Sequence, residues 1–209
     1  MAATKNPPSI TPQDDPYLEP ESRAVHRAAY LDGLDVAGEA WVFGYGSLMW
    51  NPGFEYLESV PATLWGWHRS FCIYSHVYRG TPQEPGLVLG LDRGGSCHGM
   101  AYRIDAARVL DVLGYVWDRE MVTGVYEPRT VKARVKGRTT TCHTYTVHRG
   151  HYQYAGRLEL DACARLISDA RGKGGSNRDY LANTVTHLDE LGIDDGPLHV
   201  LLRLVEAKY

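Results

Sequence analysis

The sequence lacks both a long hydrophobic run and a large excess of charge of either sign. No stretch reaches the roughly 18 consecutive apolar residues that a membrane-spanning helix needs. The 209 residues carry 22 basic and 25 acidic side chains, a formal net charge of −3. This balance excludes the basic surface of nucleic-acid-binding proteins and a polybasic membrane patch. The N-terminus also lacks the basic start and apolar core of a signal peptide, so we expect a cytoplasmic protein.

Cysteine is scarce, and its spacing does not suggest metal binding. A chain of this length can bury about 70% of its unfolded surface, so it needs no disulfide or metal to stabilise its core. Zinc ribbons need closely spaced cysteine pairs, and neither a C-x-x-C pair nor an H-E-x-x-H motif is present. We expect buried thiols in a reducing compartment and no metal site. The four cysteines are Cys72, Cys97, Cys142 and Cys163.

Proline distribution divides the chain into two parts. Five of the eleven prolines lie within residues 1–20, which also hold few large apolar side chains. This composition predicts a poorly ordered arm or a strap along the surface. Residues 21–31 are compatible with a short helix, and 33–39 read as a linker. We therefore expect an N-terminal arm over 1–40 and one domain over 41–209.

Hydrophobic periodicity after residue 40 changes between strand and helix spacing. Strands mixed with one helix, followed by several helices, predict an α+β fold with a mainly antiparallel, curled sheet rather than a doubly wound parallel one. The expected strands are 41–43, 62–74, 87–91, 97–104, 130–135 and 139–147, with turns at Gly94-Gly95 and Lys136-Gly137. The expected helices are 106–118 capped by Asp105, one bearing Leu158, Ala162 and Leu166 and closed by Gly172, one begun by Ser176 or Asn177, and one from Pro197.

A glycine-containing turn, GYGSL at residues 44–48, directly follows the first strand. Glycine permits backbone conformations in which consecutive N–H groups point into one concavity. Such a nest binds an anion, or a carbonyl oxygen that is becoming anionic. The segment is not a dinucleotide-binding fingerprint, because Met49 stands at the third glycine position, and it lacks the Gly-Lys-Ser/Thr element of a P-loop. The alternative is an ordinary turn at the end of a strand.

Glu120 is a candidate general base at the C-terminal end of the helix predicted over 106–118. The negative end of the helix dipole disfavours ionisation of a carboxyl there. Burial would add to this effect and move the pKa of Glu120 towards that of a useful base. The alternative is a solvated helix end with Arg119 in a weak surface ion pair.

Arg79 and Tyr180 are further candidates for ligand contacts. Arg79 lies in a loop rich in proline and glycine, where a guanidinium can clamp a carboxylate by two parallel hydrogen bonds. The alternative is a turn arginine without a ligand. Tyr180 could direct its hydroxyl to a polar ligand, although a tyrosine on a helix more often packs its ring in the core. Covalent hydrolase chemistry has little support, because no G-x-S-x-G elbow is present.

Several short motifs follow one another along the chain: residues 41–50 (WVFGYGSLMW), 66–69 (GWHR), Arg79-Gly80, Pro85-Gly86, 99–103 (GMAYR), 119–121 (REM), Thr123-Gly124, Tyr126, Asn177 and Tyr180-Leu181. Taken in this order, they resemble the ChaC family of γ-glutamylcyclotransferases, in its glutathione-specific branch. His98 departs from the aromatic residue common in the family, and the first forty residues have no counterpart in its short members.

The resemblance implies a small twisted β-barrel surrounded by helices, without a metal or other cofactor. It implies that the substrate is glutathione, which is cleaved to 5-oxoproline and cysteinylglycine, with Glu120 as the general acid and base. Two alternatives stay open: a cyclotransferase for other γ-glutamyl amines or amino acids, and a non-catalytic module that binds γ-glutamyl metabolites. The sequence leaves the oligomeric state open. The candidate substrate-binding residues are Phe43, Gly44, Tyr45, Gly46, Ser47, Leu48, Arg79 and Tyr180.

Overall fold

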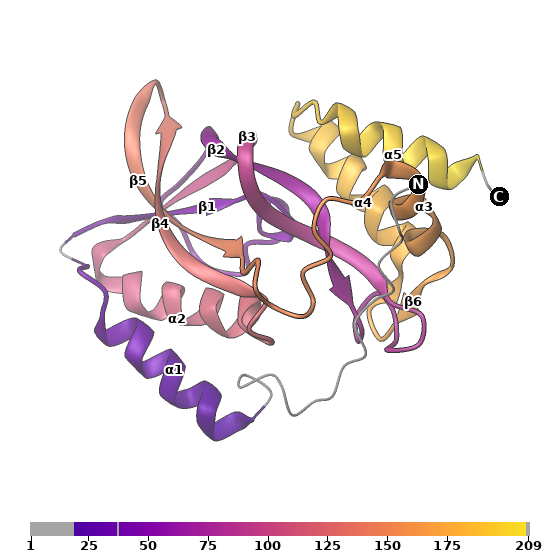
Figure 1. Ribbon diagram of the computed structural model, residues 1–209. Coiled ribbons are helices and arrows are strands. Elements are labelled where there is room, and N and C mark those ends of the chain that lie inside the picture. Colours follow the sequence, from indigo (N-terminus) through magenta and orange to yellow (C-terminus); the bar gives the residue numbers. More distant parts are fainter. Residues whose placement is uncertain (1–18, 37, 208–209) are drawn as a thin grey trace. The chain divides into compact units, whose positions relative to one another are not determined.

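A computed structural model describes residues 19–36 and 38–207 of the chain (Figure 1). The arm expected over residues 1–20 therefore lies almost wholly outside the described residues. The chain divides into two compact units, which we call the barrel unit and the helical unit. Of the described residues, the barrel unit holds 19–69 and 91–148, and the helical unit holds 70–90 and 149–207.

Five strands form a closed barrel. In chain order they are β1 (Ala40–Gly44), β2 (Glu58–Ser75), β3 (Gly86–Ile104), β4 (Tyr126–Val135) and β5 (Arg138–Val147). Their order around the barrel is β1-β3-β2-β4-β5. The β1–β3, β2–β4 and β4–β5 pairs are antiparallel, while β1 and β5 run parallel. The predicted α+β fold with a mainly antiparallel, curled sheet is confirmed.

One long strand stands where the sequence predicted two. β3 continues through Gly94 and Gly95, where we expected the chain to reverse. Both glycines have positive φ, 104° and 66°, and the Nδ1 atom of His68 on β2 lies 3.0 Å from the carbonyl oxygen of Gly94. Paired glycines here bend a strand that stays hydrogen-bonded to its neighbour, as glycines in strands often do. The predicted turn was wrong because glycine permits a reversal without requiring it.

The hairpin predicted around Lys136-Gly137 is confirmed. Val135 of β4 pairs with Arg138 of β5, so two residues make the turn. Both have positive φ, 49° at Lys136 and 76° at Gly137, as a type I′ turn requires. Val131 and Ala133 point into the core together with Val135, which matches the predicted alternation.

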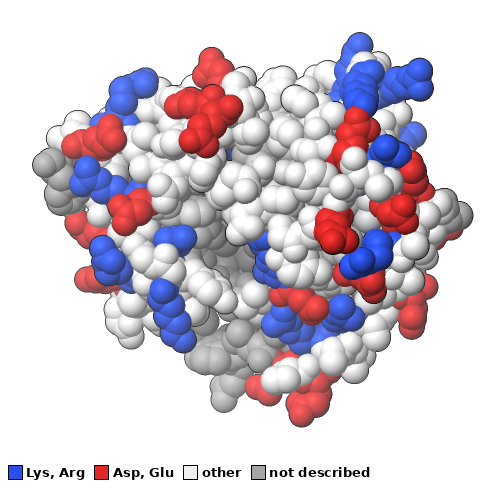
Figure 2. Space-filling view, turned by 180° about the vertical axis from the view of Figure 1, so that it is seen from behind, with Lys and Arg blue, Asp and Glu red and all other residues white. Residues whose placement is uncertain are grey.

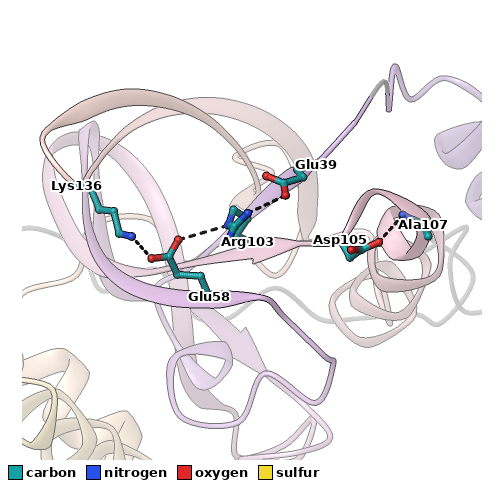
Figure 3. A network of polar contacts seen from close by, with 6 residues as sticks. All are labelled: Glu39, Glu58, Arg103, Asp105, Ala107 and Lys136. Carbon is teal, nitrogen blue, oxygen red and sulfur yellow. Dashed lines mark hydrogen bonds and ion pairs between the residues drawn. The ribbon is translucent and has the colours of Figure 1, made fainter.

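Ion pairs join the start of β1, the start of β2 and the hairpin turn within the barrel unit (Figure 3). Arg103 on β3 holds Glu39 through its Nη1 atom at 2.7 Å and Glu58 through its Nε atom at 3.4 Å. Glu58 also pairs with Lys136. These side chains are a quarter to more than half exposed, so water screens each pair and its contribution to stability is small. The network therefore favours correct strand pairing more than it adds stability.

The helix that carries the candidate base begins where β3 ends. The Asp105 carboxylate accepts a hydrogen bond of 2.9 Å from the Ala107 N–H, as predicted for a cap (Figure 3). A short 3-10 turn, η3 (Ala106–Arg108), leads into α2 (Val109–Glu120). The helix predicted over 106–118 is confirmed and ends two residues later. The buried face of α2 consists of Val109, Val112, Leu113, Gly114, Val116 and Trp117.

The short helix expected over 21–31 is present as α1 (Pro20–Asp32), and it packs on α2. The Nε atom of Arg27 lies 2.9 Å from an Asp118 carboxylate oxygen. A Cβ atom on Gly114 would lie only 2.4 Å from the Arg27 guanidinium. A glycine inside a helix costs about 1 kcal/mol relative to alanine. An alanine at position 114 would require the flexible end of the Arg27 side chain to move away from α2.

Three helices pack against one another in the helical unit. They are α3 (Leu160–Asp169), α4 (Asn177–Glu190) and α5 (Gly196–Glu206), with the short strands β6 (Arg171–Gly172) and β7 (Gly175–Ser176) before α4. Ser176 caps α4 by accepting a hydrogen bond of 3.0 Å from the Asp179 N–H, as predicted. The last helix also begins beside Pro197 as predicted, with the Asp195 side chain as its cap.

Two details predicted for α3 were wrong. The helix begins after Leu158, and Cys163, Ala164 and Ile167 form its buried face. The predicted face included positions 162 and 166, which lie at the edge of the buried face and are only half-buried. Gly172 does not close α3 but pairs with Gly175 in the β6–β7 hairpin. A side chain there would lie 2.5 Å from the Val77 carbonyl oxygen, so close backbone contact explains this glycine.

The described helices and surface agree with the composition. Within residues 19–36 and 38–207, none of the helices has the length and apolar content needed to cross a membrane. Lys and Arg side chains lie among Asp and Glu side chains on the face seen in Figure 2. A formal net charge of −3 predicts such a mixed surface.

Candidate active site

The glycine-containing turn follows β1 in the barrel unit. Its 3-10 segment, η2 (Ser47–Met49), is closed by a hydrogen bond of 2.8 Å from the Met49 N–H to the Gly46 carbonyl. The N–H groups at the start of such a turn have no acceptor within the turn. The buried Tyr102 hydroxyl lies 2.9 Å from the Leu48 carbonyl oxygen and 2.8 Å from that of Met49. Tyr102 therefore supports the turn from the core side.

Gly99 of β3 allows the close approach that positions this turn. A Cβ atom at residue 99 would lie 2.3 Å from the Gly44 carbonyl oxygen and 2.8 Å from the Phe43 ring. Gly44 is the last residue of β1, and the turn begins there. The match of 99–103 to the expected family motif thus has a steric explanation at its first residue.

Glu120 is the last residue of α2, and its side chain is only 17% exposed. Burial raises the pKa of the carboxyl from 4.5 to about 7, and the neighbouring Arg119 guanidinium opposes part of that rise. The carboxyl also stands at the negative end of the α2 dipole. A pKa near neutrality suits a group that must both accept and donate a proton.

Arg119 links Glu120 to the glycine-containing turn. Its Nη2 atom donates to the Ser47 hydroxyl at 2.8 Å, and its Nε atom lies 3.6 Å from a Glu120 carboxylate oxygen. Its Nη1 atom donates to the carbonyls of Asn51 at 2.6 Å and Pro52 at 3.3 Å. One guanidinium therefore touches the candidate base, the turn and the loop after it. The alternative considered from the sequence was a solvated helix end with Arg119 in a weak surface pair.

Comparison with known proteins shows the family to which this chain belongs. The family model described as ChaC-like protein matches residues 40–208. The chain belongs to the ChaC-like family. A glutathione-specific γ-glutamylcyclotransferase of Escherichia coli (strain K12) is 39% identical over 183 residues, which cover 87% of this chain and 79% of the relative. A protein of the same name from Schizosaccharomyces pombe (strain 972) is 33% identical over 187 residues, with 80% and 91% covered.

A solved structure supports the fold of this ChaC-like chain. The crystal structure of a γ-glutamyl cyclotransferase specific to glutathione from yeast superposes with a TM-score of 0.73. The alignment covers 81% of this chain and 96% of the yeast chain at 24% identity. The predicted barrel with surrounding helices is therefore the fold of a known γ-glutamyl cyclotransferase.

Arg79 and Tyr180 of this ChaC-like chain meet each other in the helical unit. The Arg79 guanidinium lies 4.9 Å from the centre of the Tyr180 ring. Its Nη1 atom bonds the Gly174 carbonyl and lies 3.4 Å from the Ser176 carbonyl oxygen. Both carbonyl contacts use Nη1, so the N–H donors of Nη2 and Nε do not take part in these two contacts. The structure thus places the two candidates in one cluster beside the start of α4.

Asn177, a third residue of the expected family motifs, anchors α4 to β3 within the helical unit. Its Oδ1 atom accepts from the Leu87 N–H at 2.6 Å, and its Nδ2 atom donates to the Leu87 carbonyl at 2.7 Å. The side chain is fully buried. A Cβ atom on Gly86 would lie 2.5 Å from Asn177 Oδ1, so the glycine of the Pro85-Gly86 motif makes room for this contact.

Replacing Asn177 by alanine should destabilise the protein by about 2–4 kcal/mol, because two buried backbone groups of Leu87 lose their partners. The free energy of unfolding in urea measures this loss. Asn183→Ala, at an exposed position on the same helix, is the matched control and should change it by less than about 0.5 kcal/mol. Equal stability of the two variants would contradict the anchoring role.

Tyr145 is a residue near the candidate base that the sequence reasoning missed. It lies on β5 with 3% of its surface exposed. Burial raises its pKa, and Tyr30 of α1 and Glu120 add to the rise, so both groups are close enough to act on it. Strand alternation predicts an inward side chain here. An inward tyrosine on a strand normally indicates core packing, so sequence reasoning had no basis for assigning Tyr145 to a site. Its proximity to Glu120 depends on how β5 and α2 meet in space.

The histidines and cysteines do not assemble a metal site in the part of the chain that the structure describes, which contains no group of three potential ligands. Burial lowers the pKa of His143 on β5, which favours its neutral form. The four cysteines are buried, as expected.

Burial of Glu120 should make the folded chain less stable as the pH rises. Between pH 4.5 and about 7, the unfolded carboxyl has released its proton while the folded one retains it, so a higher pH favours unfolding. The loss amounts to about 3 kcal/mol and is complete above pH 7. Urea unfolding should therefore find Glu120→Gln more stable than wild type at about pH 8 and equal at about pH 4. The control Glu55→Gln changes a carboxyl that is 86% exposed, and its stability should match wild type at both pH values. If the stability of Glu120→Gln also matched wild type at both pH values, the raised pKa of a buried Glu120 would be contradicted.

Proposed function

We propose that this chain is a glutathione-specific γ-glutamylcyclotransferase, a lyase that cleaves glutathione to 5-oxoproline and cysteinylglycine. The observation that carries the proposal is a half-buried Glu120, with its pKa near 7, joined through Arg119 to the Ser47 turn. The names of the Escherichia coli and Schizosaccharomyces pombe relatives support the same substrate.

The reaction is an intramolecular transfer that consumes no water. The α-amine of the γ-glutamyl group attacks its own γ-carbonyl carbon and closes a five-membered lactam. The amide bond to cysteine then breaks, and the cysteinyl nitrogen leaves as an amine. Glu120 accepts the proton that the attacking amine loses and returns it to the leaving nitrogen. Acid–base assistance of this kind contributes about 10²–10⁴-fold to the rate.

The glycine-containing turn stabilises the negative charge that develops on the γ-carbonyl oxygen. One well-placed backbone N–H donor is worth about 10²–10³-fold in rate. The same turn holds the glutamyl α-carboxylate, which bends the substrate into its attack geometry. The residues assigned to this γ-glutamyl subsite are Phe43, Gly44, Tyr45, Gly46, Ser47 and Leu48.

Arg79 and Tyr180 are the proposed contacts for the cysteinylglycine half. Support comes from the Arg79 guanidinium donors other than Nη1, for which the described residues show no acceptor, and from the packing of Arg79 on the Tyr180 ring, which holds the fork in place. The catalytic domain in this proposal comprises residues 41–209, preceded by an arm over 1–40. The burial of all four cysteine thiols supports a reducing, cytoplasmic location.

A comparison of two substrates tests the proposed function. Glutathione should release 5-oxoproline and cysteinylglycine in equal amounts. Its kcat/KM should exceed that of γ-glutamyl-alanine by about 10²-fold, because cysteinylglycine offers a thiol and a second amide that alanine lacks and places its carboxylate one residue further from the scissile bond. Equal turnover of the two would indicate a broader γ-glutamyl specificity. Release from neither, despite binding of glutathione, would indicate a non-catalytic binding module.

A further inference from the structure

The last turn of α2 presents three consecutive charged side chains, Asp118, Arg119 and Glu120. Asp118 pairs with Arg27 of α1, while Arg119 reaches the turn after β1. Glu120 follows with its carboxyl 3.6 Å from the Arg119 Nε atom. Arg119 is only 22% exposed, so water weakens its contacts less than it weakens those of the exposed arginines.

We propose that Arg119 is a positioning residue that holds the glycine-containing turn and the Glu120 carboxyl at a fixed separation. The role rests on the proposed cyclotransferase function, since this separation matters only if the turn and the carboxyl act on one substrate. Arg119 itself need not touch the substrate. It works through Ser47 on one side and Glu120 on the other.

The rigid fork of the guanidinium suits this task. Nη2 binds the Ser47 hydroxyl, Nη1 binds the Asn51 and Pro52 carbonyls, and Nε faces Glu120, so the three nitrogen atoms serve three different segments. A lysine ammonium has the same charge but only one nitrogen on a flexible stem. Charge and geometry can therefore be separated by substitution.

The charge of Arg119 also restrains the protonation of Glu120. Burial raises the pKa of Glu120 and Arg119 lowers it, so loss of the arginine should raise it further. Among the described residues, the other titratable groups near Glu120 do not supply a positive charge in place of Arg119. Tyr145 from β5 and its neighbour Tyr30 from α1 both have raised pKa values and stay neutral. Asp118 carries a negative charge and pairs with Arg27.

The test compares Arg119→Gln, Arg119→Lys and the control Arg108→Gln. Arg108 lies just before α2, is 53% exposed and pairs with Glu55 and Asp111 outside the site. The titration of Glu120 is followed by carboxyl 13C NMR without substrate and assigned by its loss in Glu120→Gln. Arg119→Gln should move the midpoint upward by about one pH unit, the size of a Coulomb interaction at this distance in water. Arg119→Lys and Arg108→Gln should leave it near the wild-type value.

Kinetics with glutathione separate geometry from charge. Both Arg119 variants should raise KM about tenfold or more, because the turn loses its link to α2. Only Arg119→Gln should also move the acid limb of kcat/KM upward, while Arg108→Gln should match wild type in both. An unshifted Glu120 titration in Arg119→Gln, or a wild-type KM in Arg119→Lys, would overturn the role of Arg119.

The two measurements also keep this proposal separate from the proposed function. The NMR titration needs no turnover, so it decides on the charge effect even if wild type does not cleave glutathione. A wild-type protein that releases no 5-oxoproline rejects the proposed function alone. If Arg119→Gln does not fold, Arg119→Lys carries the test through its KM and its melting temperature.

Discussion

Replacing Glu120 by glutamine should lower kcat for glutathione cleavage by about 10³-fold while KM changes only a few fold. Glutamine keeps the size of the side chain but can neither accept the proton of the attacking amine nor return it to the leaving nitrogen. A large loss in kcat is expected because both halves of the reaction depend on this one carboxyl.

The kinetic experiment needs a carboxyl that can be removed without consequence. Glu55→Gln changes an 86% exposed carboxyl of the same unit and should retain wild-type kcat. Release of 5-oxoproline and cysteinylglycine is followed over time for all three proteins, with a melting curve for each. Activity of Glu120→Gln within severalfold of wild type would remove Glu120 from the mechanism.

Gly99→Ala should reduce kcat/KM by about 10²-fold or more, although residue 99 lies outside the proposed γ-glutamyl subsite. The added methyl group would lie 2.3 Å from the Gly44 carbonyl oxygen and 2.8 Å from the Phe43 ring, so the end of β1 must move. A displacement of about 1 Å in a positioning element can cost two orders of magnitude in rate. Overpacking of this kind should also destabilise the fold by about 1–3 kcal/mol.

A second glycine variant separates displacement of the turn from a general effect of added methyl groups. Gly196→Ala, at the start of α5, places its methyl group where no atom lies within 4 Å. It should retain wild-type kcat/KM. Circular dichroism and urea unfolding establish that Gly99→Ala still folds. A folded Gly99→Ala protein with wild-type kcat/KM would show that the Gly44–Gly99 contact does not position the turn.

Local patterns in the sequence predicted most of the architecture. The alternation of Val131, Ala133 and Val135 and the Lys136-Gly137 pair identified the hairpin, because a two-residue turn needs two residues that tolerate positive φ. Asp105 and Ser176 identified helix starts, because a side-chain acceptor there satisfies a free backbone N–H. Such signals act within a few residues, so they are visible in one sequence.

Features that depend on distant segments were predicted less well. Gly94 and Gly95 bend a strand instead of reversing it because β3 remains paired with β2, a neighbour that the local sequence does not reveal. Arg119 looked like an exposed helix-end residue because its partner Ser47 lies 72 residues away. The same holds for Tyr145, which meets the surroundings of Glu120 only through the barrel. The sequence thus identified the candidate base but not the residues around it.

Product analysis in water enriched in 18O tests the central claim most directly. Wild-type protein incubated with glutathione should release 5-oxoproline without 18O and an equal amount of cysteinylglycine, because the attacking atom is the substrate's own nitrogen. Glu120→Gln should release little of either under the same conditions. Glutamate carrying 18O, formed with cysteinylglycine, would identify attack by water and contradict the intramolecular mechanism.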